Sequence, residues 1–172
     1  MKLLNNFIQT FKVPVPVFDR ILEVIALVLL SVLLGLTTVL YLQAPEQIPT
    51  SFNWNEEPTG WADKAMYWYM AVFFDLMMLL SATSAYDFKF MNFPVRLKEP
   101  VINLQKMYIS RMSRFLTLCI GIMWLSYLLS TAAAFWDISL FAAVFSKVSL
   151  FILLALLIYY SVKVWWIGRG YE

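Results

Sequence analysis

Two charged side chains, Asp75 and Lys147, interrupt long apolar stretches of a 172-residue chain that is 62% hydrophobic and 14% charged. A charge at the centre of a membrane helix costs about 2.5–3.5 kcal/mol, so each side chain needs a partner or a route to water. An intramembrane ion pair would satisfy both, because opposite charges in a low-dielectric interior stabilise each other. The alternative is that Lys147 reaches the headgroup layer while Asp75 is protonated or bonds to a nearby Tyr or Ser.

No other residues are spaced for familiar catalytic chemistry. The absence of histidine excludes histidine metal ligands and the bases of Ser-His and Cys-His nucleophile pairs. Cys119 is the lone cysteine and cannot form an internal disulfide, and five dispersed glycines cannot make a phosphate-binding loop. Glu23 is most simply the helical partner of Arg20, three positions earlier. We therefore expect a non-enzymatic protein with no cofactor, no metal site and no nucleic-acid partner.

Four segments are long and apolar enough to cross a bilayer, which needs about 20 residues. Backbone polar groups find no water in hydrocarbon, so all four are expected to be helices. The predicted fold class is an all-α integral membrane protein, with an interfacial segment over residues 1–18 and a single four-helix membrane domain over residues 19–172. The predicted spans are Ile21–Leu42, Ala65–Ala85, Phe115–Phe135 and Ile138–Val162.

The segments that flank the spans carry signals of their own. The apolar residues of segment 1–18 fall on one helical face, which is typical of a short helix lying on the inner leaflet; a disordered amphipathic tail is the alternative. Pro100 stands at a favourable first helical position, so the third helix can begin well before Phe115. Only Trp136 and Asp137 separate the third and fourth spans, which requires a tight antiparallel turn.

Charge predicts the direction of the bundle. Lysine and arginine gather on the cytoplasmic side of membrane proteins. They precede the first span, fill the inner loop 86–114 and recur in the tail, whereas the loop 43–64 carries four acids and one lysine. Both termini are therefore predicted inside, and loop 43–64 outside. The basic inner loop either fixes this topology and meets anionic lipid, or binds a cytoplasmic partner.

The outer loop 43–64 is the most specific stretch of the sequence. Three prolines restrict its backbone, so the loop is expected to hold one shape, with its two tryptophans suited to the headgroup layer. Phe52 is expected to pack inward over the bundle, and Asn53 to bond to the loop backbone, as asparagine in turns does. The loop is either a rigid cap over the helices or a binding loop. The candidate residues for these roles are Pro45, Pro49, Phe52, Asn53, Pro58, Trp61 and Lys64.

The pattern P-x-x-I-P-x-x-F-N-x-x-x-x-P-x-x-W-x-x-K over Pro45–Lys64 resembles the signature of a bacterial membrane domain of unknown function (DUF1648). That domain forms the N-terminal half of SdpI-like immunity and signalling proteins. A weaker match is NFPVRL at Asn92–Leu97, and the resemblance covers roughly Tyr41–Leu129. Ser51 and Glu56 stand where the family usually has a histidine and a glycine.

The resemblance implies a non-enzymatic protein of the bacterial inner (cytoplasmic) membrane, linked to immunity against a secreted peptide toxin and to signalling through capture of a soluble repressor. Its partners would be a peptide or protein at the outer loop, a cytoplasmic protein at the basic inner loop, and membrane lipids. A shared domain does not fix a function. The alternative is a small accessory or scaffold subunit of a larger membrane transport or secretion complex, since the small-residue patches Ser81–Ala85 and Thr131–Ala134 allow close helix approach.

Overall fold

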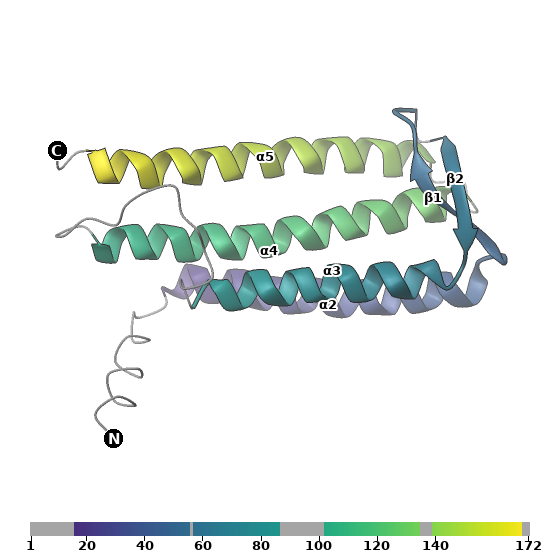
Figure 1. The fold of residues 1–172 in the computed structure, drawn as a ribbon, viewed down its shortest axis with the longest axis horizontal. Helices are drawn as coiled ribbons and strands as arrows, with labels where there is room; N and C mark the ends of the chain where they lie inside the picture. Colours follow the sequence, from purple (N-terminus) through teal and green to yellow (C-terminus); the bar gives the residue numbers. More distant parts are fainter. Residues whose placement is uncertain (1–15, 56, 87–101, 135–138, 170–172) are drawn as a thin grey trace, which may run out of the picture.

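The computed structural model describes residues 16–55, 57–86, 102–134 and 139–169. The four helices lie side by side, and two strands cross one end of the bundle (Figure 1). We call this end the hairpin end and the opposite one the far end. In chain order the elements are α2 (Val17–Gln43), β1 (Gln47–Phe52), β2 (Pro58–Asp63), α3 (Met66–Ser84), α4 (Ile102–Ala133) and α5 (Ser139–Arg169).

Each of these four helices is long and apolar enough to cross a membrane. Large apolar side chains on α2, α3 and α5 point away from the bundle, as Leu27, Leu79 and Phe151 do with 64%, 60% and 68% of their surface exposed. Soluble monomers rarely expose contiguous apolar surface on this scale. The chain is therefore a multi-pass membrane protein, as predicted. The start of α2 and the end of α5 both lie at the far end (Figure 1).

α4 is the central helix. It lies between α5 on one side and the α2–α3 pair on the other (Figure 1). Half (50%) of its most apolar stretch is buried, compared with 17%, 22% and 18% for α2, α3 and α5. Gly121 permits this close packing, because a Cβ there would lie 2.6 Å from Leu29 Cδ2. The largest core cluster comprises Leu33, Leu40, Ile48, Tyr67, Ala71, Met78, Trp124, Leu128 and Ala132.

The chain leaves α2 because of a proline. Ala44 has φ −70° and ψ 146°, the extended conformation favoured by a residue that precedes proline. The chain then enters α3 after Asp63, whose Oδ1 accepts a 2.7 Å hydrogen bond from the Ala65 N–H. Between these two points the backbone folds back on itself.

The loop between α2 and α3 is a β-hairpin, so the expectation of an all-α protein needs correction. The two strands pair antiparallel, with Pro49 opposite Trp61. The Lys64 N–H donates to the Glu46 carbonyl at 2.9 Å. Hydrogen-bonded and non-hydrogen-bonded pairs alternate along an antiparallel ladder, so Pro49, three positions after Glu46, falls in a non-hydrogen-bonded pair. Its missing N–H is therefore not needed there. The loop is structured as predicted, but its order comes from strand pairing as well as from proline.

The helices differ from the predicted spans at their ends. α4 begins at Ile102, which confirms that the third helix starts before Phe115, and α5 continues past Val162. The 32 residues of α4 make a helix about 48 Å long, longer than the hydrocarbon core of about 30 Å. Residues 1–15, the loop segment 87–101 and the predicted turn at 136–137 lie outside the described residues.

Candidate functional site

The hairpin rests on α4 through one strand. Ile48 and Pro49 of β1 are buried, and the Tyr127 hydroxyl of α4 donates to the Pro49 carbonyl at 3.2 Å. The ring of Phe52 packs edge-on against Tyr127, with centroids 6.4 Å apart, so Phe52 points inward as predicted. The underside of the hairpin is thus part of the bundle core.

The turn of the hairpin is closed by Asn53. Its Oδ1 accepts hydrogen bonds from the N–H groups of Asn55 (2.8 Å) and Glu57 (2.9 Å). Its Nδ2 donates to the Glu57 carboxylate at 2.7 Å, and its backbone N–H donates to the Glu57 carbonyl at 3.0 Å. The prediction that Asn53 bonds to loop backbone is confirmed, and the mechanism is the usual one for asparagine in turns.

A second tie joins the turn to α5. The Lys147 ammonium donates to the carbonyl of Trp54 at 2.7 Å. The predicted ion pair with Asp75 is therefore not seen, and no salt bridge among the described residues joins these two side chains. The reason is the order of helices, because α4 lies between α5 and α3 (Figure 1). Lys147 reaches outward, as the competing interpretation held, but to the hairpin backbone.

Lys64 fixes the open end of the hairpin. Its ammonium lies 2.8 Å from Glu46 Oε1 and 5.7 Å from the centroid of the Tyr41 ring. The hydrogen bond to Glu46 is the main reason that the pKa of Lys64 is raised above its ordinary value. One lysine thus links the last turn of α2 to both strand ends.

The outer surface of the hairpin is aromatic and polar. Trp54 in the turn is 75% exposed and Trp61 in β2 is 57% exposed. Pro45 and Pro58 are also exposed. The seven predicted residues thus all lie in or beside the hairpin, with Pro49 buried, Phe52 packed against Tyr127 and Trp61 more than half exposed. The hairpin thus carries two exposed aromatic side chains at this end of the bundle.

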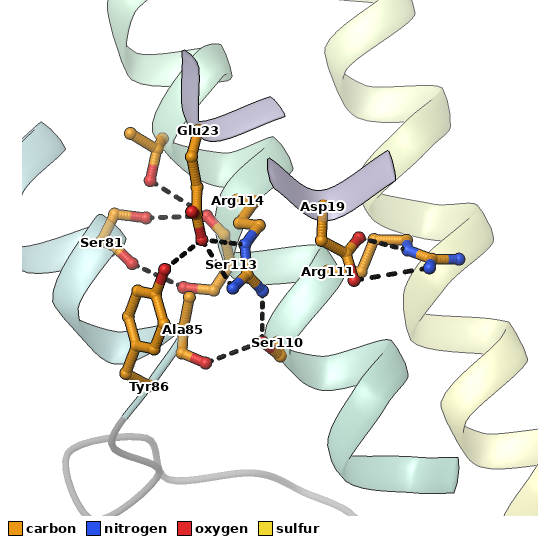
Figure 2. A network of polar contacts seen from close by, with 10 residues as sticks. Asp19, Glu23, Ser81, Ala85, Tyr86, Ser110, Arg111, Ser113 and Arg114 are labelled. Carbon is orange, nitrogen blue, oxygen red and sulfur yellow. Dashed lines mark hydrogen bonds and ion pairs between the residues drawn. The ribbon is translucent and has the colours of Figure 1, made fainter. Parts of the chain in front are cut away.

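At the far end, the structure brings together charged residues that sequence reasoning did not connect (Figure 2). Asp19 of α2 is only 1% exposed, and its Oδ1 accepts a 2.8 Å hydrogen bond from Arg111 Nε of α4. The guanidinium of Arg111 also lies over the Phe18 ring, 5.1 Å from its centroid. This ion pair joins the first helix to the central one.

A second ion pair lies one turn further along. Arg114 of α4 is 4% exposed and bonds to Glu23 Oε1 through Nε at 2.8 Å and Nη2 at 2.7 Å. The Tyr86 hydroxyl donates to the same Oε1, and Arg114 Nη1 donates to Ser110 (Figure 2). The prediction that Glu23 pairs with Arg20 is wrong, because α4 presents the buried guanidinium of Arg114 to the Glu23 carboxylate.

Tyr86 closes this group from the end of α3. Burial raises the pKa of its phenol above the ordinary value, and the hydrogen bond to the Glu23 carboxylate raises it further. The Arg114 guanidinium lies 5.1 Å from the centroid of the Tyr86 ring. Three helices therefore meet at one carboxylate.

Serine side chains pack α3 against α4 beside the ion pairs. Ser113 Oγ donates to the Ser81 carbonyl at 2.6 Å and lies 2.6 Å from Ser84 Oγ. Ser110 Oγ donates to the Ala85 carbonyl at 2.7 Å (Figure 2). The patch Ser81–Ala85 thus serves internal packing, which weakens the case for an intersubunit surface there.

The ion pairs do leave a signal in the sequence. Asp19 and Glu23 are four residues apart and so share one face of α2, while Arg111 and Arg114 are three apart and share one face of α4. Two acids and two bases at helical spacing on different helices match in register. The prediction of a basic inner loop over residues 86–114 places both arginines outside the bundle and so misses these pairs.

Asp75 lies in a groove between α2 and α3 of about 280 Å³. Its Oδ1 is buried and has no hydrogen-bond partner among the described residues. The groove is otherwise apolar, apart from Thr117, whose hydroxyl donates to the Ser113 carbonyl, and the Glu23–Arg114–Tyr86 group at its far end. Its lining includes Ala26, Leu27, Leu30, Met78, Leu79 and Ala82.

The cysteine and the acidic side chains are the first candidates for redox or metal-binding groups in the described part of the chain. Cys119 is buried inside α4. In the described ranges, no three acidic or cysteine side chains converge in the way that a metal site requires. The polar groups of the bundle instead engage one another in ion pairs and hydrogen bonds between helices.

Residues 26–79 match the family model of a domain of unknown function (DUF1648). The match covers most of α2, the whole hairpin and most of α3, which confirms the resemblance carried by Pro45–Lys64. It begins earlier than the expected Tyr41 and ends before the weaker NFPVRL motif. No curated protein and no solved structure matches the chain.

Proposed function

We propose that this chain is a non-enzymatic protein of the bacterial inner membrane that recognises a peptide or protein through its hairpin, in sensing or in immunity. The observation that carries the proposal is the construction of the hairpin. Its underside is fixed to α4 by Tyr127 and to α5 by Lys147, while Trp54 and Trp61 are exposed. Exposed aromatic side chains on a rigid support are what recognition surfaces use.

The charge distribution supports an outward-facing hairpin. Lysine and arginine favour the cytoplasmic side. The far end carries basic side chains of α4 and α5, among them Arg111, Arg114, Lys163 and Arg169. The hairpin segment 43–64 carries four acids against Lys64. We infer that both termini are cytoplasmic and that the hairpin meets a partner arriving from outside.

Site-specific photo-crosslinking in intact cells tests the proposal. A benzophenone amino acid placed at Trp54 or Trp61 should give one discrete adduct, because a fixed hairpin presents the same surface in every molecule. The matched control is Trp166, an exposed tryptophan of α5 at the other end of the bundle. Lys147→Met removes the contact that holds the turn and should lower the yield of the adduct.

Two results would argue against recognition by the hairpin. If the adducts at Trp54 and Trp61 consisted only of lipid, the hairpin would be a membrane-surface cap. If a protein adduct formed instead at the apolar outer face of α5, for example at Phe151, the accessory or scaffold subunit of a larger complex would be the better description. The two proposals therefore differ in where the adduct forms.

A further inference from the structure

The groove between α2 and α3 has more hydrogen-bond acceptors than donors. Asp75 Oδ1 is buried without a partner among the described residues. At the far end of the groove, the described contacts of Glu23 all use Oε1. The one guanidinium in the lining, Arg114, is already engaged with Glu23 and Ser110. The Asp75 carboxyl group thus has no cationic partner in the groove.

The shape of the groove restricts what can reach Asp75. Leu27 and Leu79, which flank it, are strongly exposed on the surface that faces hydrocarbon. Asp75 lies at the midpoint of α3, and Tyr86 follows eleven positions later, about 16 Å along the helix axis. The walls between them are apolar and include Ala26, a small residue. Such walls suit a mostly apolar molecule that reaches the groove from the lipid side.

We propose that this groove is a binding site for a lipophilic amine, a small organic molecule whose ammonium group pairs with Asp75 and whose apolar body lies between Ala26, Met78 and Ala82. An ammonium supplies both the positive charge and the hydrogen-bond donors that the carboxylate lacks. At about 280 Å³, the groove is near the lower limit of small-molecule pockets, so the ligand is small.

Other ligand classes fit less well. An anionic head group would face Asp75 and Glu23, because Arg114 is neutralised by its existing ion pair. A neutral alcohol could donate one hydrogen bond to Asp75 but would leave its charge unpaired. The site is separate from the hairpin, and its test does not depend on the function proposed for the hairpin.

A matched ligand series tests the chemistry: 4-phenylbutylamine, 4-phenylbutanol and 4-phenylbutyrate share one apolar body. The protein, carrying ¹³C-labelled alanine and methionine methyl groups, is titrated in lipid bicelles and followed by NMR. The amine should shift the methyl resonances of Ala26, Met78 and Ala82 saturably, at a concentration at least tenfold below that needed for the alcohol or the acid. Ala155, exposed on α5, is the reporter for unspecific partitioning and should not saturate.

Two sets of variants test separately the role of the Asp75 charge and the role of the space in the groove. Asp75→Asn should raise the concentration for half-saturation by the amine at least tenfold, to that of the alcohol, while Asp75→Glu should stay within a few-fold of the native protein. Ala82→Phe should fill the groove and abolish the shifts at Ala26, whereas Ala155→Phe should leave them unchanged. Equal binding of amine and alcohol by the native protein would overturn the proposal without any variant. Unchanged amine binding by a folded Asp75→Asn protein would do the same.

Discussion

The Lys147 ammonium donates a 2.7 Å hydrogen bond to the carbonyl of Trp54, a residue 93 positions earlier in the chain. The hairpin is adjacent in sequence to α2 and α3, yet its turn is held by α5 and its first strand by α4. The conformation of the hairpin therefore depends on helices outside the matched domain of residues 26–79.

We expect Lys147→Met to loosen the hairpin turn without unfolding the bundle. Losing a charge-assisted hydrogen bond of this kind costs about 1.5 kcal/mol, which corresponds to about tenfold faster opening. Amide hydrogen exchange in the turn, at Asn55 and Glu57, should accelerate by about that factor. The matched control is Lys163→Met, which removes an exposed lysine of the same helix. Equal acceleration in both variants would show that the Trp54 contact does not hold the turn.

Asn53→Ala should also disorder the turn, by a different route. The substitution removes the acceptor for two backbone N–H groups, and a lost hydrogen bond of this type costs about 1 kcal/mol. The exchange rates of those two amides should rise about fivefold or more, while the amides of α4 keep theirs. Asn55→Ala, in the same turn, is the control, and it should leave the exchange rates near native values.

The ion pair between Asp19 and Arg111 should behave as a coupled unit. Arg111→Met leaves the buried Asp19 carboxylate without its counter-ion and should lower the free energy of unfolding by about 3–5 kcal/mol. Asp19→Asn should cost less, because the Arg111 side chain is 18% exposed and can turn toward water. The double variant should recover at least half of the larger loss.

The measurement is reversible unfolding in mixed micelles, followed by circular dichroism. Lys64→Met provides the contrast, because it removes a surface ion pair whose carboxylate is 80% exposed, and surface pairs contribute little to stability. Strict additivity of the two far-end substitutions would contradict coupling between Asp19 and Arg111.

Stability at alkaline pH should depend on Tyr86. The pKa of its phenol is raised in the folded protein, by burial first and by Glu23 next, above its ordinary value of 10.0. The folded state thus keeps the proton after the unfolded chain has lost it. This contribution is complete below about pH 10 and is lost as the pH rises through the folded-state pKa. Tyr86→Phe should flatten the decline of the unfolding free energy above pH 10, and an unchanged slope would contradict the assignment.

Orientation can be tested with an impermeant maleimide in intact cells. In a Cys119→Ala background, a cysteine at Asn55 in the hairpin should be labelled. A cysteine at Asn103, in the first turn of α4 at the other end of the bundle, should be labelled only after the membrane is opened. Labelling in the reverse order would invert the predicted inside and outside.

The sequence predicts the bundle well because membrane spans follow from composition alone. Runs of about 20 apolar residues must be helical in hydrocarbon, and the structure has a helix at each predicted place. The helix ends were less predictable. The early start of α4 was predicted from Pro100, but the pairing of Arg111 and Arg114 with carboxylates on α2 could not be deduced from the local sequence of α4.

The hairpin was predictable as an ordered loop but not as a sheet. Period-two alternation, the usual strand signal, is weak here, since the buried residues Ile48 and Pro49 are consecutive. The Asp75–Lys147 pair failed for a different reason. Opposite charges within two apolar spans do not reveal which helices are neighbours, and the neighbours are set by packing around α4.

α4 touches both ends of the molecule. It carries Tyr127 beneath the hairpin and Arg111 and Arg114 at the far end, within 32 residues that contain no proline. An unbroken helix of about 48 Å tilts or shifts as a rigid rod. A displacement imposed on the hairpin would therefore be carried mechanically through the whole thickness of the bilayer. It would strain the two ion pairs that hold the opposite end of this rod to α2.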